Sequence, residues 1–165
     1  MTIERLLKID KGIEWVQTAL SILLFTAILV LGSIQVVGRY VLASAPPWTE
    51  EAMRFCGIYL TFVGSSLTVR ADAHVSVDLL IGFIKNNRIR AMLFVVARMI
   101  CVVFLILFLP ASVDLVRRST SFLSASMQIP YSYVYLAAPL GIIMMLCSYA
   151  SAIPRLSKKY REGEL

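Results

Sequence analysis

The stretch PPWTEEAMRF, residues 46–55, places two adjacent carboxylates and an arginine at the start of an apolar segment. Glu50 and Glu51 precede Arg54, and the fifteen residues 55–69 carry no charge. Acidic residues in the first turn of a helix are favoured by the helix dipole, and Glu50 and Arg54 have the i,i+4 spacing of an ion pair. These charges could therefore stabilise the first turn of a helix, or they could form a surface that binds a partner protein.

Few other side chains have types and spacings that suit catalysis. His74 is the only histidine, so the chain cannot supply the paired axial ligands of a membrane cytochrome. Cys56, Cys101 and Cys147 are far apart and form neither a CxxC redox pair nor a disulfide framework. The sequence shows no nucleophile–base pair, phosphate-binding loop or metal-ligand cluster. We therefore expect a protein that is not an enzyme and holds no cofactor of its own.

The composition places these charges in an integral membrane protein. The chain has 165 residues, of which 59% are hydrophobic, and a mean hydropathy of +0.80. Soluble domains have about 45–50% apolar residues, interleaved with charges. Here residues 15–38 and 129–153 carry no charge at all. Each run exceeds the roughly 20 residues that cross the hydrocarbon of a bilayer.

We predict an all-α membrane protein with four transmembrane helices, over about residues 13–42, 48–70, 89–115 and 131–153, in one domain of residues 1–165. The second span has the shortest uncharged core, and a re-entrant segment is the alternative there. The stems of Arg54 and Arg70 can extend to the two interfaces, which makes a short span tolerable.

A short amphipathic helix is predicted between the second and third spans, over residues 74–86. Its apolar face would carry Val77, Leu80, Ile81 and Ile84, and its polar face His74, Asp78 and Lys85. Such a helix lies in the membrane interface.

Basic residues predict the orientation of the spans. Eleven of the 16 lysines and arginines lie before the first span, in or flanking the connection between the second and third, or after the fourth. The positive-inside rule therefore places both termini and the middle connection in the cytoplasm.

Small and polar residues form a stripe along each of the first two spans. They recur at intervals of four and three residues, in the sets Ser21, Phe25, Ile28, Gly32, Gln35, Arg39 and Glu50, Arg54, Gly57, Thr61, Gly64, Thr68. Small residues on such a stripe let a neighbouring helix approach closely. Because eight residues separate Arg39 from Trp48, the two spans must form a tight hairpin.

We expect Arg39, Glu50, Glu51 and Arg54 to form one charged cluster at the outer end of this hairpin. Glu50 would brace the two helices, and Glu51 would face a partner protein.

Arg98 lies roughly a third of the way into the third span. An intramembrane charge costs at least a few kcal/mol on insertion scales, so it pairs or faces protein. Arg98 is expected to reach cytoplasmic headgroups or a carboxylate on a partner protein.

No acidic residue lies in the middle of a predicted span. This argues against a proton-coupled carrier, because such carriers typically need an intramembrane carboxylate.

The order of several motifs resembles a known family. Arg39–Tyr40 is followed by Trp48 with the paired glutamates, then by Gly64, Arg70, the segment His74-Val75-Ser76-Val77-Asp78, Ser124, Ile129–Pro130 and Pro139-Leu140-Gly141. Together these resemble the small membrane subunit, of DctQ type, of tripartite ATP-independent periplasmic (TRAP) transporters. The resemblance covers about residues 30–145, and residues 39–78 are its most specific part.

The resemblance implies a three-part uptake system in the inner membrane of a bacterium. A periplasmic substrate-binding protein would capture an organic anion, such as a C4-dicarboxylate or sialic acid, and a large multi-span subunit would move it with a sodium gradient. The small subunit would act as a scaffold in contact with both proteins and with membrane lipids, and not with nucleic acid. Its outer contact region would contain Arg39, Trp48, Glu50, Glu51 and Arg54.

Two other classes of protein remain as alternatives. An autonomous small transporter or channel, as a homo-oligomer, would be favoured by a mid-membrane Asp or Glu. A membrane anchor for a redox enzyme would be favoured by several intramembrane histidines. The sequence contains neither feature.

The predicted topology can be tested by thiol labelling. Single cysteines at Ser44 and Ser121, in a chain without its own cysteines, should react with an impermeant reagent added to intact cells, because both lie in outer connections. A cysteine at Ser157 should stay unlabelled, and its labelling in intact cells would contradict this orientation.

Overall fold

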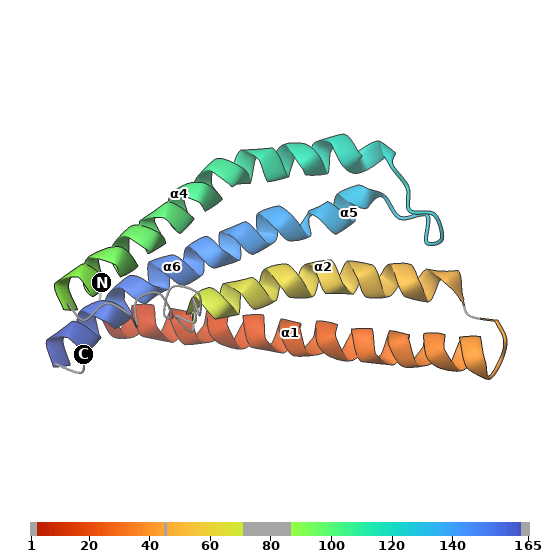
Figure 1. The fold of residues 1–165 in the computed structure, drawn as a ribbon, viewed down its shortest axis with the longest axis horizontal. Helices are drawn as coiled ribbons and strands as arrows, with labels where there is room; N and C mark the ends of the chain where they lie inside the picture. The colour runs from red at the N-terminus through yellow and green to blue at the C-terminus, as the bar shows by residue number, and fades with distance from the viewer. Residues whose placement is uncertain (1–2, 45, 71–86, 163–165) are drawn as a thin grey trace.

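Long apolar helices make up most of the structure, a computed structural model that describes residues 3–44, 46–70 and 87–162 (Figure 1). The helices are α1 (Ile3–Tyr40), α2 (Pro47–Arg70), α4 (Asn87–Arg118), α5 (Tyr131–Tyr135) and α6 (Ala137–Glu162), with a 3₁₀ turn η1 at Ser119–Ser121. Four stretches are long and apolar enough to cross a membrane, namely Asp10–Tyr40, Pro47–Arg70, Val96–Ser121 and Tyr131–Ala150. The predicted all-α fold with four membrane-spanning helices is confirmed.

The helices begin and end near the predicted positions, with differences that have local causes. α1 begins at Ile3 rather than near residue 13, because the charged N-terminal segment continues the helix beyond the apolar run. The fourth span consists of α5 and α6, which are interrupted at Leu136. Pro139 accounts for this interruption, since it has no N–H to donate to the carbonyl of Tyr135. The predicted interfacial helix at residues 74–86 lies outside the described residues.

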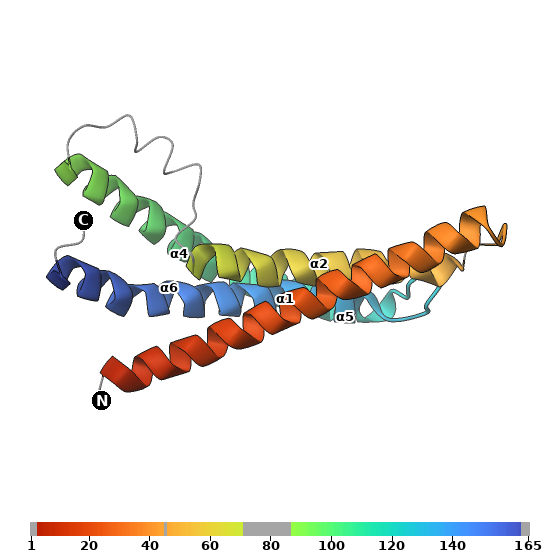
Figure 2. The same ribbon diagram turned by 90° about the horizontal axis from the view of Figure 1, so that it is seen from below.

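The helices lie side by side in the order α4, α6, α2 and α1 (Figure 1). α2 contacts α1 on one side and α6 on the other, whereas α4 packs against α5 and α6. The connection from α1 to α2 and the connection from α4 to α5 lie at one end of the molecule, which we call the loop end (Figures 1 and 2). The start of α1 and the end of α6 lie at the opposite end, and their cytoplasmic location stays a prediction.

The core is small and lies where α2, α4 and α6 meet. Its buried members are Val69, Leu105, Ile142 and Tyr149. Much of the remaining apolar surface is exposed, and Leu23 of α1 and Leu107 of α4 are examples. Exposed side chains of this kind on a membrane-spanning helix face lipid or another membrane protein.

α6 passes very close to α2 at Gly141. A Cβ atom built at Gly141 would lie 2.5 Å from the Cβ of Phe62 and 2.8 Å from its Cδ1, so a side chain does not fit without a backbone shift. By contrast, a Cβ atom built at Gly57 or Gly64 meets no atom of the described residues within 4 Å. The small-residue stripe of α2 therefore does not form the packing seam between the described helices.

The face of α2 that is buried is a different one. Its buried residues are Thr49, Val63, Ser66, Val69 and Arg70. The stripe of α1 agrees better with the prediction, because a Cβ atom at Gly32 would lie 3.4 Å from the Sδ of Met53 in α2. A role of Gly57 and Gly64 in contacting a partner protein remains a prediction.

The close approach at Gly141 predicts a stability difference between two alanine variants. Gly141→Ala should destabilise the chain by about 1–3 kcal/mol, because the added methyl group overpacks against Phe62. Gly57→Ala is the matched control and should be neutral or stabilising by up to about 1 kcal/mol, since helical glycine is unfavourable and this site is open. Thermal unfolding in detergent measures both, and equal midpoints would contradict the packing.

Candidate functional site

At the loop end, the carboxylate of Glu51 is surrounded by hydrogen-bond donors from the loop that joins α4 to α5. Its Oε2 accepts hydrogen bonds from the hydroxyl of Ser124 at 2.9 Å and from the backbone N–H of Met127 at 3.0 Å. The backbone N–H of Ser126 lies 3.1 Å from each of the two carboxylate oxygens. Hydrogen bonds to an ionised group are shorter and stronger than neutral ones. Glu51 therefore ties α2 to this loop.

The loop itself has a defined backbone shape. The N–H of Ser124 donates to the carbonyl of Ile129 at 2.9 Å, and the N–H of Tyr131 donates to the carbonyl of Phe122 at 2.8 Å. Gln128 has a φ of 54°, a left-handed conformation that is uncommon for residues other than glycine. Its side-chain Nε2 donates to the carbonyl of Ala125 at 3.1 Å and closes the turn. The hydroxyl of Tyr59 in α2 also donates to the carbonyl of Tyr133, beside this loop.

Glu50, the neighbour of Glu51, has a different environment. It accepts a hydrogen bond from Nη2 of Arg54 at 3.3 Å, and the two side chains are 63% and 64% exposed. Exposed ion pairs contribute about 0–1 kcal/mol. The prediction that Glu50 braces the helices while Glu51 faces outward is therefore wrong for this geometry. Successive residues on a helix point about 100° apart, so α2 cannot turn both side chains toward the loop.

The predicted cluster of four charges does not form. Arg39 is exposed near the end of α1, and among the described residues no ion pair joins it to Glu50 or Glu51. The hydrogen bonds of Glu51 direct its carboxylate to the opposite side of α2, toward α5. Trp48 is exposed at the start of α2. Arg39, Trp48, Glu50 and Arg54 thus lie at the loop end as expected, but as an exposed surface rather than a buried network.

The opposite end of the hairpin holds a buried ion pair that sequence reasoning missed. Nη1 of Arg70 donates to the carboxylate of Asp10, and also to the backbone carbonyl of Asp10 at 2.9 Å. The side chains of Arg70 and Asp10 are only 3% and 6% exposed. A signal was present in the sequence: an acid just before the first apolar run and a base just after the second meet when the two helices are antiparallel.

The other predicted site residues are placed as follows. Arg98 is half-buried and lies near enough to Tyr149 of α6 for an electrostatic interaction. Its expected contact with headgroups or with a carboxylate of a partner protein stays a prediction. Gln17 of α1 is buried as well, and its Nε2 donates to the hydroxyl of Ser148 in α6 at 3.5 Å. His74 and Asp78 lie outside the described residues.

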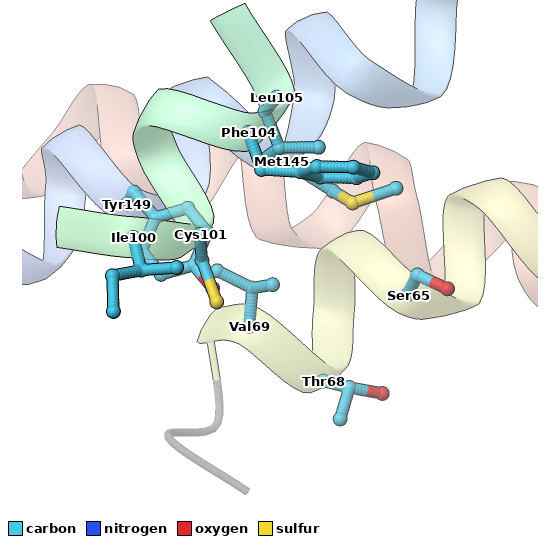
Figure 3. Close-up of a pocket in the computed structure, with 9 residues that line it drawn as sticks. All are labelled: Ser65, Thr68, Val69, Ile100, Cys101, Phe104, Leu105, Met145 and Tyr149. Carbon is cyan, nitrogen blue, oxygen red and sulfur yellow. The ribbon is translucent and has the colours of Figure 1, made fainter. Parts of the chain in front are cut away.

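An open groove of about 450 Å³ lies between α2, α4 and α6 (Figure 3). Phe104 and Leu105 of α4 and Met145 and Tyr149 of α6 form much of its lining. Ser65 and Thr68 of α2 also line it, but their hydroxyls donate to carbonyls of their own helix at 2.7 and 3.1 Å. The groove is therefore apolar and suits hydrocarbon better than an anion. Among the described residues, no group of three or more His, Cys, Asp or Glu side chains is placed to hold a metal ion.

The fold defines a multi-pass helical membrane protein in which a few polar side chains, such as Gln17, Glu51 and Arg70, join its own segments. The sequence matches the profile of the family described as "Tripartite ATP-independent periplasmic transporters, DctQ component" over residues 28–159. Because this match covers most of the chain, the protein belongs to the DctQ family of transporter components, and the resemblance found from its motifs is confirmed. The search of curated proteins finds no match.

The Asp10–Arg70 pair predicts a large effect of removing one partner. Asp10→Ala should destabilise the chain by about 3–5 kcal/mol, because it leaves the buried guanidinium of Arg70 without its carboxylate. The double variant Asp10→Ala/Arg70→Met should recover much of that loss, since no unpaired charge then remains. Glu50→Ala is the exposed control and should cost no more than about 1 kcal/mol. Unfolding in detergent measures all three, and similar losses for Asp10→Ala and Glu50→Ala would contradict this assignment.

Proposed function

We propose that this chain is the small scaffold subunit of a sodium-driven TRAP transporter for an organic anion, such as a C4-dicarboxylate or sialic acid. It supports the large transport subunit, helps to dock the periplasmic substrate-binding protein, and lies in the inner membrane of a bacterium. Sodium coupling and substrate translocation belong to the large subunit. The match to the DctQ family carries this proposal, because that family is one component of a three-component transporter.

The contacts of the described polar residues support a scaffold role. Asp10 and Arg70 join α1 to α2, Gln17 joins α1 to α6, and Glu51 joins α2 to the α4–α5 loop. These groups are therefore committed to holding the helices together. The groove between α2, α4 and α6 is apolar, whereas a carboxylate substrate needs charged or hydrogen-bonding partners.

The shape of the molecule supports the same role. The helices form a row, with α4 at one edge and α1 at the other (Figure 1). Such an arrangement leaves broad apolar faces, and the open stripe at Gly57 and Gly64 lies on one of them. Small residues at an exposed membrane face allow a helix of another protein to approach closely. A large multi-span subunit is the partner that this surface fits.

Transport assays in liposomes can distinguish a scaffold subunit from an autonomous carrier. The purified chain alone in liposomes should move no organic anion, with or without a sodium gradient, because the described spans offer an apolar groove and no mid-membrane acid. The chain co-expressed with its large subunit should co-purify with it, and uptake should need that subunit and the binding protein. Sodium-driven uptake by this chain alone would show instead that it is a small homo-oligomeric transporter or channel.

A further inference from the structure

The paired glutamates at the start of α2 differ in what they contact. Glu50 forms an exposed pair with Arg54 on its own helix, whereas Glu51 accepts four contacts from Ser124, Ser126 and Met127 of a distant loop. Ser124 is fully buried and Glu51 is partly buried, so their contact lies between α2 and the loop. The side chain of Glu51 is thus engaged from within the protein, and the surface that a partner meets is the loop.

We infer that Glu51 is a positioning residue, whose carboxylate holds residues 122–128 in the shape that the soluble substrate-binding protein contacts. This inference rests on the proposed function. It assigns the docking surface to the loop between α4 and α5, and it assigns to Glu51 an indirect role in docking. Glu50 and Arg54 lie beside this surface and are not needed for its shape.

The position of the loop supports a contact with a soluble partner. Residues 122–130 fall between the candidate spans Val96–Ser121 and Tyr131–Ala150, at the loop end of the molecule (Figure 1). The side chains of Phe122 and Leu123 are 64% and 54% exposed, and Ser126 and Gln128 are exposed beside them. Exposed apolar residues next to hydrogen-bonding groups are the usual composition of a protein–protein contact.

The charges around the loop indicate which partner surface fits. Four arginines are exposed near this end, whereas the exposed acids there are Glu50 and Asp114; the arginines are Arg39, Arg54, Arg117 and Arg118. The negative charge of Glu51 is engaged by hydrogen bonds from the loop. The exposed surface is therefore mainly basic and complements an acidic face on the soluble protein.

A fixed loop shape favours a protein partner over lipid headgroups. A surface that is ordered before binding loses less conformational entropy when it docks, which strengthens a shape-specific contact. Fluid headgroups have no fixed shape to match. Loss of the Glu51 contacts should therefore weaken docking without slowing the transport steps that follow docking.

Hydrogen exchange on the purified chain in nanodiscs tests the positioning role without any partner. Glu51→Gln keeps the length of the side chain but replaces one acceptor oxygen with an NH₂ donor. The amides of Ser126 and Met127 should then exchange about tenfold faster, because they lose hydrogen bonds to a charged acceptor. Glu50→Gln is the matched control and should leave them unchanged. Equal exchange in the wild type and Glu51→Gln would overturn the inference.

Uptake by the reconstituted complex, measured against the concentration of binding protein, tests the docking role. Glu51→Gln should raise the half-saturating concentration about tenfold with an unchanged maximal rate, and Glu50→Gln should change it little. Ser124→Ala, which removes one hydrogen-bond donor to Glu51, should also raise the half-saturating concentration, but by less. If the Glu51→Gln complex does not assemble, the Ser124→Ala complex is used for the test instead. Faster exchange with an unchanged half-saturating concentration would overturn the loop as the docking surface.

Two further outcomes separate this inference from its alternatives. If the shift in half-saturating concentration disappears when anionic lipids are replaced by neutral ones, the loop contacts headgroups and the inference fails. If the wild-type complex takes up substrate without any binding protein, the proposed function fails, while the exchange experiment still decides whether Glu51 positions the loop.

Discussion

The interior of a bilayer offers no water to polar groups, so each buried hydroxyl, amide or charge of this protein needs a partner within the molecule. The described helices meet much of this requirement in two ways, although some buried atoms, such as Oε1 of Gln17 and Oγ of Ser21, have no hydrogen-bond partner among the described residues. Hydroxyls such as those of Thr61, Ser66 and Ser148 donate to carbonyls of their own helices. Charged side chains that are shielded from solvent instead form contacts between different segments, as Asp10 does with Arg70 and Glu51 with the α4–α5 loop. These few contacts help to determine how the helices are arranged.

α2 is anchored by polar contacts at both of its ends. Asp10 and Arg70 join α1 to α2 at one end, and Glu51 joins α2 to the loop before α5 at the other. The apolar core between these contacts is small, and α6 reaches α2 closely only because Gly141 has no side chain. Since a mispaired buried charge is costly, the Asp10–Arg70 contact favours one register of the helices over the others.

A row of helices with broad apolar faces agrees with a subunit of a larger membrane complex. α2 lies between α1 and α6, while α4 packs mainly against α6, the short α5 and the turn η1. Membership of a family of tripartite transporter components implies that the chain has protein partners, and we propose that one of them contacts these faces. At the loop end, the neutral loop tip and the exposed arginines form a surface of a different kind, which we propose contacts the soluble protein.

The class of protein, the number of membrane spans and their approximate bounds follow from the sequence, because the thickness of the hydrocarbon determines how many uncharged residues a span needs. The family was also evident from the order of its motifs between Arg39 and Gly141. The sequence did not show in which direction each charged side chain points. Neighbouring residues on a helix point about 100° apart, and only packing selects which one faces inward. Glu51 rather than Glu50 became the internal contact when the α4–α5 loop folded against α2. Asp10 and Arg70, 60 residues apart in the sequence, became partners only through the closure of the hairpin.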